Sequence, residues 1–291
     1  MLHLRGLALV YPDGTPALRG LSLDAERGVV GLLGPNGAGK SSLMRVLATL
    51  QRPTAGTARF DGIDILREPD RLRQRLGYLP QEFGVYPGVT TREMLDHMAV
   101  LKGIPDRAVR NEVVEALLAR VALWDVRDRA LASLSGGMRR RFGVAQALIG
   151  DPGLLLLDEP SAGLDPTERN RLLDIVAEAG DGAVVLLSTH LVEEVAAICP
   201  RVVLLVNGRS RLDGTPAALT AALRGRVWQR AVDRSAAGDA SAGLAVLSRR
   251  LTAGRTVLRV LADERPTEEW ETAEPSLEDV YLAGVTWPGT G

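Results

Sequence analysis

The sequence contains very few lysines, a single cysteine and no long apolar run. Lys40 and Lys102 are the two lysines among 35 basic residues, so the other 33 are arginines. A genome that favours arginine codons is the simplest explanation of this skew. The lone Cys199 excludes an internal disulfide, and such a residue is usually a small buried apolar side chain. The cysteine content fits a reducing compartment and does not indicate a metal-binding or nucleophilic cysteine.

The apolar runs are too short for the chain to cross a membrane by itself. The longest are residues 154–157, 183–187 and 202–206, whereas a membrane-spanning helix needs about 20 apolar residues. Residues 1–5 also lack the charged and apolar regions of a signal peptide, so none is expected. Any part in transport would therefore require other chains to form the pore.

The charge of the chain is balanced. The 35 basic and 36 acidic residues leave a formal net charge of −1, unlike the basic character of nucleic-acid binders and polybasic membrane anchors. A basic run, Arg139 to Arg141, falls in an expected helix, and we interpret it as a solvent-exposed face rather than a nucleic-acid site. No nucleic-acid partner is expected.

Several short apolar segments indicate an α/β fold. They are four to six residues long, and the later ones are nearly continuous, as in strands buried on both faces of a mainly parallel sheet. Residues 40–50 and 166–179 have helical patterns that separate strands, as βαβ units require. The expected strands are residues 7–10, 29–33, 154–157, 184–188 and 202–206.

The strand pattern stops in residues 84–147. Thr90 and Glu93 have the spacing of a capping box, and apolar residues then follow at helical intervals. A helix-breaking segment, residues 103–105, separates two such helical stretches. The sequence therefore predicts a helical insertion at about residues 84–147 within the sheet domain.

The composition changes again after residue 216. Residues 226–232 and 256–261 have the pattern of weak strands beside sequence rich in alanine and glycine, and residues 275–282 are typical of a capped terminal helix. We therefore expect a main domain of residues 1–216 and a small C-terminal α+β appendage of residues 217–291.

Residues 34–41, the phosphate loop, read Gly-Pro-Asn-Gly-Ala-Gly-Lys-Ser between an expected strand and an expected helix. The glycines allow backbone N–H groups to surround phosphate oxygens, and the helix N-terminus adds a favourable dipole. The ammonium group of Lys40 suits the β- and γ-phosphates, and the Ser41 hydroxyl can bind Mg²⁺. The expected nucleotide-binding residues are Gly34, Pro35, Asn36, Gly37, Ala38, Gly39, Lys40, Ser41 and Ser42.

Two acidic residues, Asp158 and Glu159, end an expected strand. The carboxyl ends of parallel strands face the ligand crevice of an α/β fold, so both should emerge beside the phosphate loop. Asp158 suits Mg²⁺, directly or through water, and Glu159 suits the orientation or deprotonation of an attacking water. The alternative is that these acids only end a strand and cap the next turn. The phosphate loop favours the catalytic interpretation.

A second glycine-rich helix start, Ser135, Gly136 and Gly137, precedes an expected helix at residues 139–149. We call these three residues the signature segment. Its N–H groups and serine side chain make it a second candidate anion site. Taken alone it is more typical of an ordinary helix start, but its position about twenty residues before Asp158 favours the anion site.

With these three elements in this order, the sequence resembles the nucleotide-binding subunits of ATP-binding cassette (ABC) transporters over residues 2–215. The resemblance implies a P-loop NTPase cassette with a mainly parallel sheet, an antiparallel β subdomain and the helical insertion. It also implies that Gln81 contacts Mg²⁺ or the lytic water and that His190 binds the γ-phosphate. Asp165 would lie in a loop at the dimer interface, and Tyr11 would pack against adenine.

The resemblance further implies an ATP hydrolase that uses Mg²⁺. Two cassettes, identical or different, would close head to tail over two ATP molecules, each site pairing one phosphate loop with the other signature segment. A separate permease subunit would hold the chain at the cytoplasmic face of the cell membrane. The rival classes are soluble cassette proteins of the ribosome, which have two cassettes, and chromosome or DNA-repair ATPases, which need a long coiled coil. This sequence has one phosphate loop and no sustained heptads.

Two further segments bear on whether the transport would be export or import. Residues 83–90 and 275–281 resemble cassette subunits of drug, antibiotic or polysaccharide exporters, although Tyr281 stands where these proteins often have phenylalanine. The alternative for the second segment is that it only caps the small domain. The resemblance implies export, with an importer subunit as the alternative, and the substrate would be selected by the membrane chain.

Overall fold

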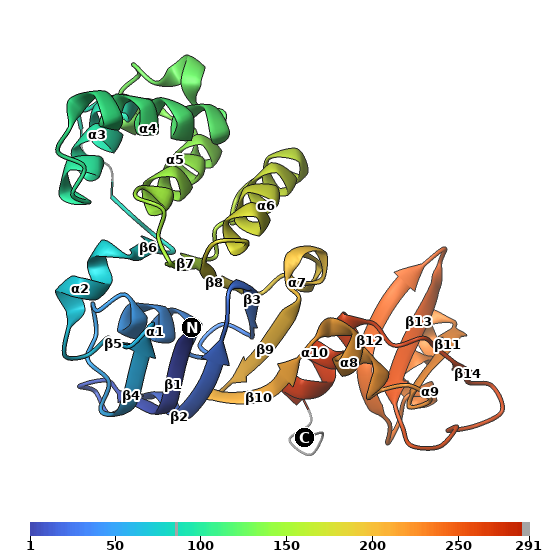
Figure 1. Cartoon of the computed structure of the whole chain (residues 1–291). Coiled ribbons are helices and arrows are strands. Elements are labelled where there is room, and N and C mark those ends of the chain that lie inside the picture. The colour runs from blue at the N-terminus through green and yellow to red at the C-terminus, as the bar shows by residue number, and fades with distance from the viewer. Residues whose placement is uncertain (85–86, 287–291) are drawn as a thin grey trace.

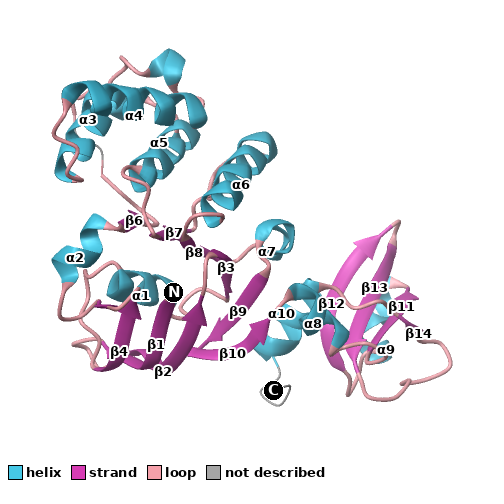
Figure 2. Ribbon diagram, viewed as in Figure 1, coloured by secondary structure: helices cyan, strands magenta, loops and turns pink. Residues whose placement is uncertain are grey.

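The computed structural model of the chain describes residues 1–84 and 87–286, which form three sheets and the helices around them (Figure 1, Figure 2). The central sheet has the order β10-β9-β3-β8-β7-β6. Its strands are parallel except for β10, which pairs antiparallel with β9. They are β3 Gly28–Leu33, β6 Leu76–Leu79, β7 Leu154–Asp158, β8 Val184–Thr189, β9 Arg201–Val206 and β10 Arg209–Gly214. The four expected strands at residues 29–33, 154–157, 184–188 and 202–206 are confirmed.

The continuous apolar character of these strands is explained by a core on each face of the sheet. Along β7, Leu155 and Leu157 point into one core, and Leu154 and Leu156 point into the other. Both cores are closed to solvent, so the strand is apolar on both faces up to Asp158, its last residue.

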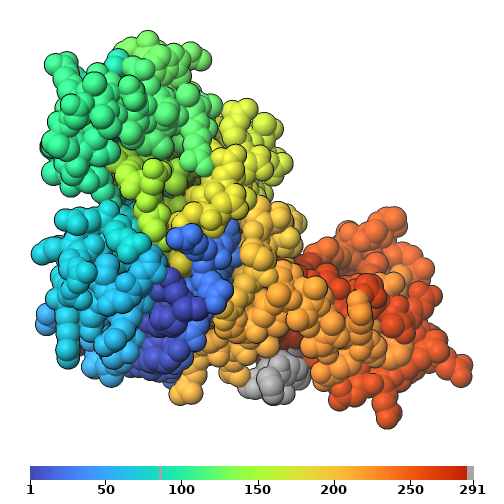
Figure 3. All heavy atoms as spheres, in the orientation of Figure 1, coloured from blue at the N-terminus to red at the C-terminus, as the bar shows by residue number. Residues whose placement is uncertain are grey.

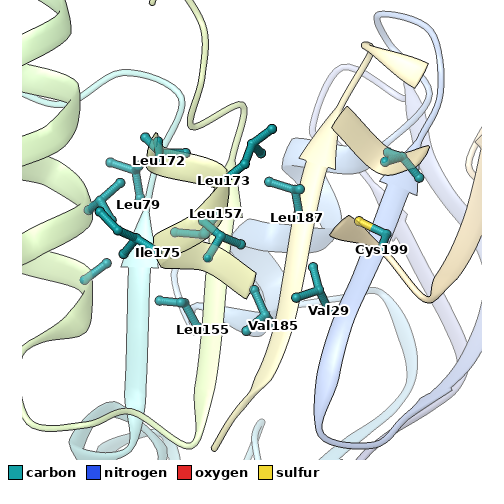
Figure 4. Close-up of a cluster of buried hydrophobic side chains, with 14 of the residues drawn as sticks. Val29, Leu79, Leu155, Leu157, Leu172, Leu173, Ile175, Val185, Leu187 and Cys199 are labelled. Atoms are coloured by element: carbon teal, nitrogen blue, oxygen red, sulfur yellow. The ribbon is translucent and has the colours of Figure 1, made fainter. Parts of the chain in front are cut away.

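Three helices cover the first face: α5 Gly136–Leu148, α6 Pro166–Gly180 and α7 Val192–Ile198. In Figure 4, strand side chains such as Leu157 and Leu187 pack against Leu173 of α6, with Cys199 at the end of this core. Cys199 is buried, as expected, and burial raises the pKa of its thiol to about 12. The thiol is therefore a packing group and not a nucleophile.

Helix α1 (Lys40–Leu47) and an antiparallel sheet cover the other face. This sheet has the order β2-β1-β4-β5, and its long strand β2 was not predicted. The expected strand at residues 7–10 is only the end of β1. The four strands are β1 Leu2–Val10, β2 Pro16–Ala25, β4 Ala55–Phe60 and β5 Ile63–Asp64.

The expected helical insertion follows β6, with the short helix α2 (Pro69–Gln74) before that strand. Helices α3 (Thr91–Leu101) and α4 (Arg107–Arg120) and the short 3₁₀ turns Trp124–Val126 and Leu131–Ser133 lie beside α5 (Figure 1). The capping box at Thr90 and Glu93 is confirmed, since the two residues exchange both of its hydrogen bonds.

Residues after 216 form a third sheet, of order β12-β13-β11-β14, which projects from the body of the molecule (Figure 3). The expected strands correspond to β11 and β13, but β12 lies in sequence that carried no clear signal. The last helix, α10, packs on α7, α8 and β9, so it joins this unit to the central sheet. The elements are α8 Pro216–Ala221, β11 Val227–Val232, the 3₁₀ turn Arg234–Ala236, α9 Ala237–Ala240, β12 Ala245–Thr252, β13 Arg255–Leu261, β14 Glu271–Thr272 and α10 Leu277–Thr286.

Candidate active site

The phosphate loop connects β3 to α1, and two of its glycines, Gly34 and Gly39, stand where a side chain would not fit. Gly39, at the helix N-cap, has a φ of 104°, and a Cβ there would lie 2.6 Å from the carbonyl oxygen of Ala17. A Cβ on Gly34 would lie 2.4 Å from the carbonyl oxygen of Leu205. At these two positions the loop is therefore folded tightly against its neighbours, as a backbone that curls around a phosphate requires.

Lys40 is nearly buried, with 5% of its surface exposed. Its Nζ donates hydrogen bonds to the carbonyl oxygens of Gly34, at 2.6 Å, and Pro35, at 3.1 Å, so the loop itself holds the ammonium group. Burial lowers the pKa of Lys40, and the nearby Glu159 and Asp158 carboxylates counteract part of this effect. The site thus concentrates positive and negative charge at the edge of the central sheet.

A cavity of about 520 Å³ lies over the phosphate loop. It brings together most of the predicted site residues, although they come from distant parts of the sequence. The cavity also includes Thr15, Pro16 and Ala17, which the sequence did not indicate. The predicted residues that line it are Tyr11, Asn36, Gly37, Ala38, Gly39, Lys40, Ser41, Ser42, Gln81, Glu159 and His190.

Tyr11 enters this cavity from the end of β1. Its hydroxyl oxygen lies 2.9 Å from the Ser42 hydroxyl oxygen, which fixes the ring beside the start of α1. An aromatic ring at the cavity wall can stack on a planar base.

Asp158 lies beneath the cavity and is 1% exposed. Its carboxylate accepts a hydrogen bond from the Ser188 hydroxyl of the adjacent strand β8. Ser188 was not among the predicted site residues. Ser41, Gln81 and Asp158 supply a hydroxyl, an amide and one carboxylate, a donor set that suits Mg²⁺, which keeps several waters and uses few protein ligands. Among the described residues no group of three or more His, Cys, Asp or Glu side chains could hold a metal by itself.

Glu159 has an unusual backbone conformation, with a φ of 50°. A non-glycine residue with positive φ is strained, and such strain persists only where neighbouring contacts impose it. The N–H of Glu159 donates to the carbonyl oxygen of Ser188 at 3.0 Å. Its side chain is mostly buried, and Oε1 lies 3.2 Å from Nδ1 of His190. The backbone thus aims this carboxylate at the cavity.

The signature segment does not line the cavity above the phosphate loop. Ser135 caps α5, and its Oγ accepts a hydrogen bond from the N–H of Met138 at 3.1 Å. Gly136 lines a different cavity, of about 440 Å³, which shares Gln81 with the first. Asp165 likewise caps α6, accepting from the N–H of Glu168 at 2.8 Å. Within one chain, the two candidate anion sites are therefore separate.

The interpretation of the arginine run as an exposed face is wrong for two of its three residues. Arg139 is exposed, but Arg140 and Arg141 are 7% and 8% exposed. The guanidinium of Arg140 donates to backbone carbonyls beside Gln81 and Glu159. The helical period could have indicated this burial, because Arg140 shares a helix face with the buried Gly143 and Val144.

Glu194 is a further residue that the sequence did not indicate. It is buried on α7, and its carboxylate accepts hydrogen bonds from the Ser161 and Thr189 hydroxyls, the latter at 2.7 Å. Ser161 follows Glu159 closely and Thr189 precedes His190. Glu194 therefore joins the two segments that carry the Glu159–His190 contact.

Comparison with known proteins agrees with this geometry. The sequence model of the family described as "ABC transporter" matches residues 18–162. The daunorubicin/doxorubicin resistance ATP-binding protein DrrA of Streptomyces peucetius is 39% identical over 97% of this chain and 91% of its own length. The probable multidrug ABC transporter ATP-binding protein YbhF of Escherichia coli is 39% identical over 78% of this chain, which spans only 39% of YbhF.

Solved structures share the fold. A structure described as the ATP-binding subunit of an ABC transporter has a TM-score of 0.69 and 28% identity, and the match covers 76% of this chain and 92% of that one. The ATP-binding cassette MJ0796, solved as a dimer bound to ADP and phosphate, also has a TM-score of 0.69, with 24% identity over 74% of this chain and 98% of its own. The predicted fold class is confirmed, and the chain belongs to the ABC transporter family, among its ATP-binding proteins.

Proposed function

We propose that this chain binds and hydrolyses ATP to drive the export of drug-like or antibiotic-like molecules through a separate membrane-spanning subunit. The observation that carries the proposal is the convergence of Lys40, Gln81, Glu159 and His190 on one cavity above the phosphate loop. These side chains provide positive charge for phosphates and a carboxylate with a neighbouring imidazole for an attacking water.

In this proposal Glu159 orients the water and accepts its proton, and His190 steadies the carboxylate through their 3.2 Å contact. Lys40 and the N–H groups of the phosphate loop offset the negative charge that develops on the transferred phosphoryl group. His190 is half-exposed in the cavity wall, so its ring can also reach the γ-phosphate.

Mg²⁺ would be held by Ser41, Gln81 and Asp158 together with phosphate oxygens. When bound, it neutralises phosphate charge. The hydrogen bond from Ser188 would hold the Asp158 carboxylate in the orientation in which it binds Mg²⁺.

The separate positions of the phosphate loop and the signature segment support a head-to-tail dimer. Two helix N-termini, those of α1 and α5, each offer N–H groups to an anion, yet they border different cavities of the chain. Each ATP would then be held by the phosphate loop of one subunit and the signature segment of a second, with Asp165 near the interface. The two subunits could be identical or different.

A permease subunit is the proposed membrane partner, and it would keep the chain at the cytoplasmic face of the cell membrane. No helix in residues 1–84 or 87–286 has the length and apolar character needed to span a bilayer. A groove of about 420 Å³ between β6 and α3, lined by Tyr78, Met98 and Leu101, offers a surface for a short segment of such a partner. Leu101 is an exposed apolar residue at this groove.

The similarity to DrrA over nearly the whole chain favours export, because that relative is described as a drug-resistance ATP-binding protein. An importer subunit is the alternative. The segment at residues 83–90, which supported export, falls partly outside the described residues, and residues 275–281 enter α10.

The test is to purify the chain together with the membrane protein that accompanies it in mild detergent, and to measure phosphate release from ATP. We expect hydrolysis that requires Mg²⁺ and stops on chelation with EDTA. Failure of the complex to hydrolyse ATP would overturn the proposal. Recovery of a membrane partner that functions with a dedicated extracellular binding protein would support the importer alternative.

A further inference from the structure

Arg140 occupies the junction between the signature helix and the two loops that carry catalytic candidates. It lies on α5, one helical turn after Gly136. An arginine side chain has five N–H donors, and in Arg140 each has a backbone carbonyl to bind. The acceptors are the carbonyl oxygens of Pro80 at 3.2 Å, Gln81 at 2.7 Å, Asp158 at 3.1 Å, Glu159, and Pro160 at 3.1 Å.

The five carbonyls belong to two loops. One follows β6 and contains Gln81, and the other follows β7 and contains Glu159. Because β6 and β7 are adjacent parallel strands, their loops leave the same edge of the sheet, and Arg140 crosses between them. No other residue type could make all these bonds, since lysine has three donors around one atom and glutamine has two.

The contact with Glu159 has a further consequence. Glu159 is held at positive φ, a conformation that costs about 1–3 kcal/mol and needs support from neighbours. Its N–H donates to the carbonyl oxygen of Ser188, and its carbonyl oxygen accepts from Arg140 and, at 3.3 Å, from the N–H of Ala162. Arg140 supplies the side-chain bond among these three, so without it the carboxylate loses part of the restraint that aims it at the cavity.

Arg141 provides a contrast within the same helix. It is equally buried, but its guanidinium donates to the carbonyl oxygens of Val121, at 3.0 Å, and Ala122, at 2.8 Å, and to Glu168. These contacts anchor α5 to the end of α4 and the start of α6, away from Gln81 and Glu159. The two neighbouring arginines are therefore equally buried, but Arg140 binds the loops that contain Gln81 and Glu159, whereas Arg141 binds the neighbouring helices.

We propose that Arg140 is a positioning residue that fixes Gln81 and Glu159 relative to the signature helix. A shift of α5, whose N-terminus would contact the ATP of the opposite site, is then transmitted to the loops of the chain's own site. The inference rests on the proposed function in assigning catalysis to these loops, but the mechanical connection itself does not depend on hydrolysis.

The test compares Arg140→Lys and Arg140→Gln with Arg141→Gln in the full chain with its membrane partner. For both Arg140 variants we expect kcat for ATP to fall about tenfold to a hundredfold while KM changes less than about twofold, because the catalytic group and not the phosphate loop is displaced. Amide exchange should become faster in residues 80–84 and 159–163 of the nucleotide-free protein. Arg141→Gln should lower the melting temperature but keep kcat and the exchange rates of those loops.

Two results would overturn the inference: wild-type kcat in folded Arg140 variants, or an equal loss of kcat in the Arg140 and Arg141 variants. If the Arg140 variants do not fold, amide exchange of the wild-type protein in low urea tests the inference. The inference requires that residues 80–84 and 159–163 lose their protection from exchange together with α5. Loss of protection in these loops independently of α5 would overturn the inference. Absence of hydrolysis in the wild type would refute the proposed function. The amide-exchange result would still test whether Arg140 connects the two loops to α5.

Discussion

Nδ1 of His190 lies 3.2 Å from Oε1 of Glu159, although 31 residues separate them in the sequence. The contact follows from the sheet, because Glu159 immediately follows β7, His190 immediately follows β8, and these are adjacent parallel strands. Ser188 and Asp158 form a second contact at the same edge. The end of β8 thus brings a partner to each of the two acids at the end of β7, Ser188 to the metal-binding candidate Asp158 and His190 to the general-base candidate Glu159.

Glu159→Gln removes the proton acceptor but keeps the shape of the side chain. We expect ATP hydrolysis to fall by about a hundredfold or more, with ATP affinity retained, since a glutamine cannot accept the proton of the attacking water. The variant should accumulate as a closed dimer with ATP, detectable by size-exclusion chromatography. The control is Glu178→Gln, an exposed glutamate on α6. Turnover at the wild-type rate in Glu159→Gln would refute its assignment as the base.

The two lysines of the chain allow a matched comparison. Nζ of Lys40 is enclosed by the phosphate loop, whereas Nζ of Lys102 donates to the carbonyl oxygens of Leu76 and Arg73, the latter at 3.0 Å. Lys40→Arg should weaken nucleotide binding by at least about tenfold, because a planar guanidinium does not fit a site built for a compact charge. Lys102→Arg should leave nucleotide affinity unchanged. Titration with a fluorescent ATP analogue measures both, and equal affinities would contradict the role of Lys40.

The phosphate loop and the acidic strand end could be predicted because their requirements are local. Glycines in a tight loop, a lysine at a helix start and a carboxylate at the end of an apolar strand each form a pattern that can be recognised within a few consecutive residues. The family resemblance then supplied Gln81, His190 and Tyr11, and the structure brings all three to the cavity that the phosphate loop borders. The parallel strands were equally clear because both of their faces are apolar.

The residues that could not be predicted depend on packing between distant segments. A run of arginines on a helix is usually solvated. The helical period can indicate which of its positions face inward, but the carbonyl partners of Arg140 and Arg141 come from other segments and could not be predicted. Strand β12 lies at the edge of the third sheet, and its last four residues, 249–252, are all exposed, so its sequence lacks the alternation of apolar and polar residues that marks a half-buried strand. Lys102, at the end of α3, likewise donates hydrogen bonds to the carbonyl oxygens of Arg73 and Leu76, and these partners are known only once the structure places β6 beside α3.

The buried carboxylate of Glu194 accepts hydrogen bonds from two hydroxyls, those of Ser161 and Thr189. Glu194→Ala would leave the buried Ser161 and Thr189 hydroxyls without this carboxylate, and we expect the free energy of unfolding to fall by about 1–3 kcal/mol. Glu193→Ala, an exposed neighbour on α7, should change it by less than about 0.5 kcal/mol. Urea denaturation of both variants measures the difference. Equal unfolding midpoints would show that Glu194 is not a structural link.

The attachment of α10 should be sensitive to acid through Asp279. This carboxylate is 3% exposed and accepts hydrogen bonds from Nε and Nη2 of Arg259, at 2.9 and 2.7 Å, and from Ser276. Burial alone would raise the pKa of Asp279, but the bonds from Arg259 and Ser276 outweigh it and hold the pKa below its ordinary value.

Because the folded-state pKa is lowered, the stabilisation by Asp279 is present above the unfolded-state pKa of about 3.9 and is lost as the pH falls through the folded-state value. At pH 7, Asp279→Asn should therefore reduce the free energy of unfolding by about 3 kcal/mol, since Arg259 loses a nearly buried partner. The difference from the wild type should shrink between pH 5 and pH 3. The control is Asp263→Asn, whose exposed pair with Arg226 should contribute less than about 1 kcal/mol. Thermal unfolding followed by circular dichroism across this range measures the effect, and a difference that stays constant with pH would contradict the assignment of the shift to the Asp279–Arg259 pair.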